Sequence, residues 1–83
     1  MFLELEREVA TVLINTFGSR PFLEDVDVEV NLMENISDLD SMGIVSLITA
    51  LEEHFNIMFD DEDIVAEYFE NIDSLTRFVK LKL

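Results

Sequence analysis

The stretch SMGIVSLITALEEHF, residues 41–55, has the clearest helical pattern in this 83-residue chain. Placed at 100° per residue, it forms one continuous apolar face, which consists of Ile44, Val45, Leu47, Ile48, Leu51 and Phe55. The opposite face would carry Gly43, Ser46, Thr49, Ala50, Glu53 and His54. Met42 breaks the pattern, because it projects to the polar side beside Ser41. It either packs against the preceding loop or offers an adaptable apolar contact to a protein partner.

Two further helices are predicted toward the ends of the chain. Apolar residues recur at helical spacing before Gly18, a residue that commonly ends a helix, and they predict a helix over residues 3–17. Asn71 can cap a last helix, whose apolar residues are Ile72, Leu75, Phe78, Val79 and Leu83. The acidic run 60–63 suits the amino end of a short helix over residues 60–69, with inward-facing Ile64, Val65, Tyr68 and Phe69.

The connection over residues 19–40 has no helical pattern. Val26, Val28 and Val30 alternate with acids as a strand would, but no second strand is available to pair with them. We expect an extended loop whose apolar side chains seal one end of a helical bundle. The sequence therefore predicts an all-α fold in one domain over residues 1–83, a four-helix bundle of three main helices and one short helix.

The charge distribution narrows the class of partner. The chain holds 19 acidic and 5 basic side chains, a formal net charge of −14, and residues 21–76 contain no Lys or Arg. Such a surface repels nucleic acid and anionic membranes and favours basic protein partners, although its only role could be solubility. The chain has no apolar run of about 18 residues that could span a bilayer and no signal-peptide pattern over residues 1–10, so we expect a cytoplasmic protein.

The side-chain inventory excludes several kinds of catalysis. Cysteine is absent, so thiolate nucleophiles and Cys-based zinc sites are excluded. The single histidine, His54, lies about 20 Å from Ser41 along the same predicted helix and cannot activate it. Twelve-residue calcium-loop spacing fails from both Asp25 and Asp60, so no dedicated metal site is expected.

The pair Asp40-Ser41 opens the central helix. Asp or Ser before an amphipathic run can simply be a helix cap. The same position also suits a phosphodiester on the Ser41 hydroxyl, because a helix amino end offers free N–H groups and a positive dipole end.

The motif Asp40-Ser41-Met42 and the helix after it resemble the acyl carrier protein family. The acidic entry at residues 60–64 and the last helix over residues 71–79 are also similar to that family, so the resemblance covers essentially the whole chain. It implies a four-helix bundle that carries cargo and is not an enzyme.

The resemblance also assigns roles to residues. Ser41, preceded by Asp40, would receive 4'-phosphopantetheine from coenzyme A through a phosphopantetheinyl transferase, and the arm would hold acyl groups as thioesters for fatty acid, polyketide or related specialised biosynthesis. The chain would act as a monomer, and its partners would be loading ligases, synthases and transferases with basic docking surfaces. Those partners would contact Met42, Val45, Thr49, Glu52 and Glu53. The residues lining the interior beside an acyl chain would be Ile48, Leu51, Phe59 and Ile64.

Two departures from the family pattern keep alternatives open. Gly43 and Ser46 stand where fatty-acid-synthesis members commonly have acids, and Phe59 precedes Asp60 without the proline often found there. The string Asp40-Ser41-Met42-Gly43 also resembles D-alanyl carrier proteins, so an aminoacyl carrier loaded by an adenylating ligase is the first alternative. The second is a non-carrier acidic adaptor in which Ser41 is only a helix cap.

Overall fold

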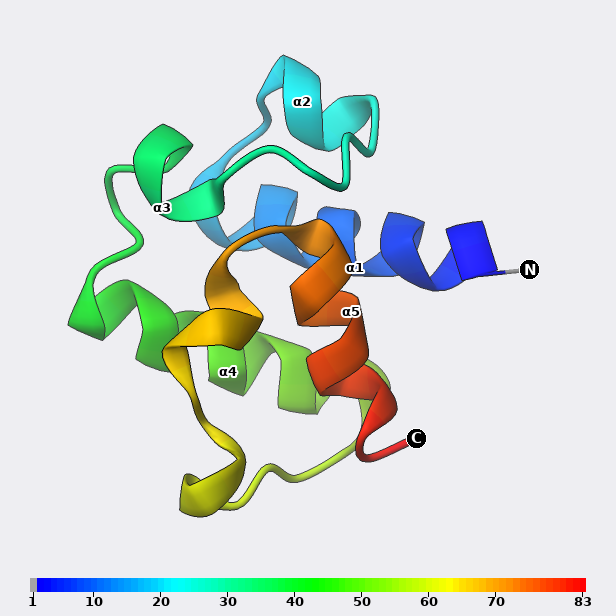
Figure 1. Cartoon of the computed structure of the whole chain (residues 1–83), viewed down its shortest axis with the longest axis vertical. Coiled ribbons are helices and arrows are strands. Elements are labelled where there is room, and N and C mark those ends of the chain that lie inside the picture. The colour runs from blue at the N-terminus through cyan, green and yellow to red at the C-terminus, as the bar shows by residue number, and fades with distance from the viewer. Residues whose placement is uncertain (1) are drawn as a thin grey trace.

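Three long helices dominate the computed structural model, which describes residues 2–83, with side chains described from Glu4 onward (Figure 1). They are α1 (Phe2–Phe17), α4 (Ser41–Phe55) and α5 (Ile72–Lys80). The shorter elements are α2 (Pro21–Glu24), α3 (Leu32–Asn35) and the 3₁₀ turns η1 (Asp61–Asp63) and η2 (Ala66–Phe69). Residues 2–83 contain no strand, which confirms the predicted all-α class.

The core lies where α1 meets both α4 and α5. Each long helix contributes fully buried apolar side chains, among them Val9, Leu13, Leu47, Leu51, Leu75 and Phe78. Burying one Leu or Phe side chain stabilises a fold by roughly 1.5–3 kcal/mol. Because the fold has no disulfide, these contacts are its main source of stability.

The predicted helix ends are confirmed by their backbone geometry. Gly18 has φ +98° and donates its N–H to the Ile14 carbonyl at 2.8 Å, which ends α1 in a conformation that favours glycine. At α5, the Asn71 side chain accepts the Ser74 N–H at 2.7 Å, and the Ser74 hydroxyl accepts the Asn71 N–H at 3.1 Å. This reciprocal capping box fixes where the last helix begins.

The connection between α1 and α4 is not the extended loop that its alternating valines predict. Val26 has φ 53°, a left-handed conformation that is rare for a β-branched residue, and α2 and α3 lie on either side of it. Val26 and Val28 do pack against the core. The fully buried side chains of the connection, however, are Leu23, Leu32 and Ile36.

The predicted short helix over residues 60–69 is also wrong in detail, because it divides into η1 and η2. The Asp60 N–H donates to Asp63 Oδ2 at 3.1 Å and closes a single turn. Ile64 and Val65 then adopt extended backbone angles, which suit β-branched residues. As a result, Val65 is 43% exposed, whereas Phe69 is buried as predicted.

Lys82 ties the carboxyl end of the chain to η1. Its Nζ lies 2.8 Å from Asp63 Oδ2 and 3.3 Å from Asp60 Oδ2. The hydrogen bond from Lys82 is the largest cause that lowers the pKa of Asp63 below its ordinary 3.8, and the same bond is the largest cause that raises the pKa of Lys82 above 10.5. The pair therefore stays ionised in the folded protein somewhat beyond both ordinary values, and its contribution to stability is complete between them.

Replacing Lys82 with methionine should lower the melting temperature at neutral pH, and the difference from wild type should vanish at both pH extremes. The contribution of Asp63, whose pKa is lowered by folding, is lost as the pH falls below 3.8 through its folded pKa. The contribution of Lys82, whose pKa is raised, is lost as the pH rises above 10.5. Thermal melts across this range, with Lys80→Met as an exposed control, would measure the difference. A gap unchanged at low pH would contradict the clamp.

Candidate functional site

Asp40 holds the amino end of α4. Its backbone is extended, its Oδ1 accepts the Gly43 N–H at 3.0 Å, and its carbonyl accepts the Ile44 N–H at 2.8 Å. Asp40 is thus the N-cap, a position where loss of the side chain typically costs about 1 kcal/mol. Ser41 is the first residue inside the helix, so the alternative in which Ser41 serves as the cap is wrong.

The Ser41 side chain is exposed next to the end of the helix dipole. Among the hydrogen bonds found within residues 2–83, none involves the Ser41 hydroxyl. Met42 is 74% exposed beside it, so the alternative that Met42 packs against the preceding loop is wrong. A hydroxyl that can accept a phosphate, a helix amino end and an apolar contact surface therefore lie together.

Gly43 is buried at the first turn of α4, against the loop that precedes the helix. A Cβ built there would lie 2.0 Å from the Asp38 carbonyl oxygen and 3.4 Å from Phe17 Cε1. The prediction that Gly43 lies on the polar face is therefore wrong, because its missing side chain lets the backbone of Asp38 approach the helix. The close approach fixes the segment that leads into Asp40.

The exposed stripe of α4 differs from the predicted polar face. Val45, predicted to face inward, is 58% exposed, whereas Ala50, predicted to face solvent, packs partly against the core. Met42, Val45 and Thr49 consequently lie on one exposed side of the helix, at spacings of three and four residues. This stripe leads from the end of the helix that carries Ser41 toward its carboxyl half.

The two acids predicted to dock partners differ in their surroundings. Glu53 is exposed, whereas Glu52 is half-buried and its Oε2 accepts the Phe59 N–H at 2.9 Å. Glu52 therefore also holds the loop after α4. Both carboxylates border a hollow of about 320 Å³ lined by Thr49, Glu52, Glu53, Asn56, Ile57 and Met58.

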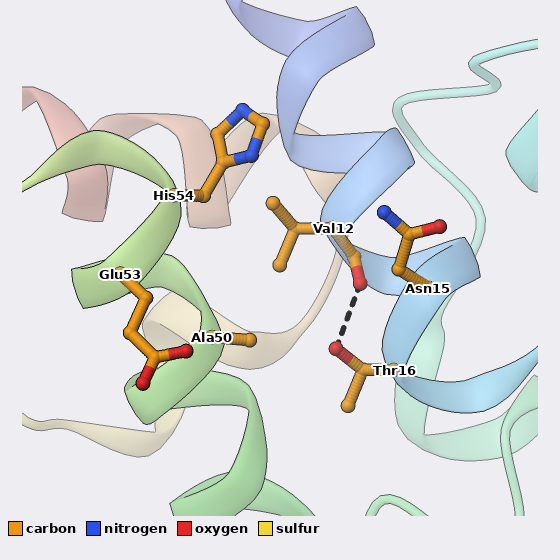
Figure 2. A pocket seen from close by; sticks show the side chains of 6 residues that line it. All are labelled: Val12, Asn15, Thr16, Ala50, Glu53 and His54. Carbon is orange, nitrogen blue, oxygen red and sulfur yellow. Dashed lines mark hydrogen bonds between the residues drawn. The ribbon is translucent and has the colours of Figure 1, made fainter.

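His54 is exposed, as predicted, and bridges α4 to α1. Its Nε2 lies 3.2 Å from Glu8 Oε1. Figure 2 shows His54 beside a second hollow, of about 280 Å³, lined by Val12, Asn15, Thr16, Ala50, Glu53 and His54. Ser41 is not among these residues, so the structure does not bring the histidine and the serine together.

The predicted interior residues lie in the core or pack against it. Leu51 is fully buried, Ile48 and Ile64 are partly buried, and Phe59 is 8% exposed. The Phe59 ring stacks on Phe78 with centroids 3.9 Å apart and an angle of 7° between the planes. The sequence did not indicate this stack, since the two residues lie on separate segments.

Neither a metal cluster nor a membrane span is found among the described residues. No group of three or more His, Asp or Glu side chains there could hold a metal ion. No helix within residues 2–83 is long and apolar enough to cross a membrane. The exposed serine at the start of α4 is thus the most distinctive chemical feature of the described chain.

An exposed serine behind a capping aspartate, in a small all-helical domain, is the arrangement expected of a carrier protein with a covalent arm. The family model described as "Phosphopantetheine attachment site" matches residues 23–79. The fold is similar to the solution NMR structure of a holo acyl carrier protein from Nitrosomonas europaea, with a TM-score of 0.80, 36% sequence identity and coverage of 92% of each chain. The chain belongs to the acyl carrier protein family, whose cofactor is covalent 4'-phosphopantetheine.

Proposed function

We propose that Ser41 carries the 4'-phosphopantetheine arm and that the protein transports acyl groups in fatty acid, polyketide or related specialised biosynthesis. The observation that carries the proposal is the exposed Ser41 hydroxyl at the first position of α4, with Asp40 as the separate cap. The matched family region includes this position. Intact-mass analysis of wild type and Ser41→Ala, after incubation with coenzyme A and a transferase, tests the proposal.

The residues around Ser41 fit a phosphodiester. The amino end of α4 supplies a positive dipole end, and the Asp40 carboxylate is occupied by the Gly43 N–H, so it fixes the helix end on which the arm would sit. When attached, the arm supplies a terminal thiol for thioester formation, which this chain lacks because it has no cysteine.

We propose that partner enzymes dock on the exposed stripe of α4 and on the acids beyond it. Met42, Val45 and Thr49 offer apolar and polar contact, and Glu53 presents an exposed carboxylate. With a net charge of −14, the protein attracts basic surfaces, which accelerates encounter at low ionic strength. Glu52 contributes charge to the same surface while it holds the loop.

We propose that the partners which dock on this surface include the phosphopantetheinyl transferase, loading ligases and synthases. We also propose that the carrier is a monomer and works with them in the cytoplasm.

Glu53→Lys should slow modification by the transferase several-fold at low salt, and the effect should shrink at high salt. The reason is that about 0.15 M salt already screens exposed charges beyond about 8 Å. Initial rates at several salt concentrations would measure it. Glu29→Lys, in the segment between α2 and α3, makes the same charge change at an exposed position outside α4 and serves as the control. Equal slowing by both variants would indicate a net-charge effect and contradict docking on α4.

An aminoacyl cargo is the second candidate. The first two turns of α4 contain no acid after Asp40. Ser46 is exposed but uncharged, and Gly43 is buried. This local gap favours a partner other than a strongly basic synthase. Loading of the holo protein with purified ligases would discriminate, because efficient D-alanylation without fatty acylation would establish the aminoacyl function.

A further inference from the structure

Phe59 lies in an aromatic cluster centred on Phe78 of α5. Besides the parallel stack with Phe59, the Phe78 ring packs at 5.0 Å from Tyr68 and at 5.4 Å and 62° from Phe69. Phe78 is fully buried, and Phe59 is nearly so. Four rings from the loop after α4, from η2 and from α5 thus pack together in the core.

The backbone around Phe59 is fixed on both sides. Upstream, Glu52 Oε2 accepts the Phe59 N–H at 2.9 Å. Downstream, Lys82 contacts Asp60 and Asp63 and ties the same loop to the carboxyl end of the chain. Because the backbone is held on both sides of Phe59, the loop cannot carry the ring outward without breaking these contacts.

The interior next to Phe59 is filled by other aromatic side chains. Phe59 stacks on the fully buried Phe78 with ring centroids 3.9 Å apart, and Phe69 and Tyr68 pack against the same Phe78 ring. Interiors packed to this degree accept added methylenes only by displacing what is already there. An acyl chain could therefore enter this part of the core only by displacing buried side chains, and the Phe59 ring, which is 8% exposed, is the member of the cluster on the loop after α4.

We infer that Phe59, stacked on Phe78, closes the interior to long acyl chains, so that the cargo is a short or polar acyl group that remains in solvent. This inference rests on the proposed function of Ser41 and adds the class of cargo to it. It makes Phe59 a determinant of specificity, although Phe59 has no part in attaching the arm.

The test compares melting temperatures after a broad-specificity transferase has loaded the protein from acetyl- or octanoyl-coenzyme A. The two wild-type forms should melt within about 1 °C of each other, because neither cargo enters the core. In Phe59→Ala, which opens an apolar cavity, the octanoyl form should melt at least about 4 °C above the acetyl form. If the alanine variant folds poorly, Phe59→Leu, a milder truncation, takes its place. It should show a gap in the same direction but smaller. Phe22→Ala removes a half-buried ring from α2 and should show no gap.

Two results would overturn the inference. An octanoyl wild-type protein more stable than its acetyl form would mean that the chain enters past Phe59. Absence of a gap in both Phe59 variants would mean that Phe59 is not the barrier.

If no cargo can be attached at all, the proposed function fails, but toluene still tests the role of Phe59. Toluene should raise the melting temperature of the unmodified Phe59→Ala protein and leave that of wild type unchanged. A melting temperature that toluene raises in wild type but not in Phe59→Ala would contradict the inference that Phe59 closes the interior.

Discussion

Replacing Ser41 with alanine is expected to abolish attachment of 4'-phosphopantetheine while leaving the fold intact. The phosphodiester needs the Ser41 hydroxyl, whereas the helix start depends on the Asp40 side chain. An exposed substitution of this kind changes stability by no more than about 0.5 kcal/mol. Incubation with coenzyme A and a broad-specificity transferase, followed by intact-mass spectrometry, should show one pantetheine-sized addition to wild type and none to Ser41→Ala.

Ser46→Ala is the matched control, because Ser46 is also exposed on α4 and lies one turn and a half further along. It should be modified as fully as wild type. A mass addition that persists in Ser41→Ala would place the arm elsewhere. Absence of any addition to the folded wild-type chain would instead support the non-carrier adaptor.

Gly43→Ala should destabilise the protein by about 1–3 kcal/mol, the usual cost of overpacking. In the interior of an exposed helix, replacing glycine with alanine normally has the opposite effect and stabilises the protein by roughly 0.5–1 kcal/mol. The sign reverses here because the new Cβ would lie 2.0 Å from the Asp38 carbonyl oxygen, a backbone atom that cannot rotate away. Urea unfolding of both proteins would measure the change in the free energy of unfolding.

Ser46→Ala again gives the reference, with a change expected within about 0.5 kcal/mol. A Gly43→Ala protein as stable as wild type would show that the segment at Asp38 moves aside at little cost. In that case the entry to α4 is not fixed by this contact, and the position of Asp40 would depend on its cap alone.

The helix boundaries could be predicted because their signals are local. Periodicity predicted residues 41–55 as the central helix, and the ends marked by Gly18 and Asn71 depend only on residues a few positions away. The family resemblance predicted the all-helical carrier fold, which the comparison with a solved carrier supports.

The predictions that were wrong or incomplete concern contacts between different segments of the chain. An angular plot of α4 places Gly43 on the polar face, but its missing side chain is what lets the loop at Asp38 approach the helix. Similarly, the sequence indicates Glu52 as a charge for docking, whereas its bond to the Phe59 N–H depends on a turn whose course is set by tertiary packing. The division between η1 and η2 has the same origin.

The cap and glycine at the start of α4 have a consequence for the evolution of this protein. The groups that shape the surroundings of Ser41, from Asp38 to Gly43, are consecutive in the chain and do not include Val45, Thr49 or Glu53. Mutations at those three exposed positions can therefore change the proposed docking surface while the local structure that presents Ser41 stays the same. In gene duplicates of such a carrier, the choice of enzyme partner can diverge without any change in the start of α4.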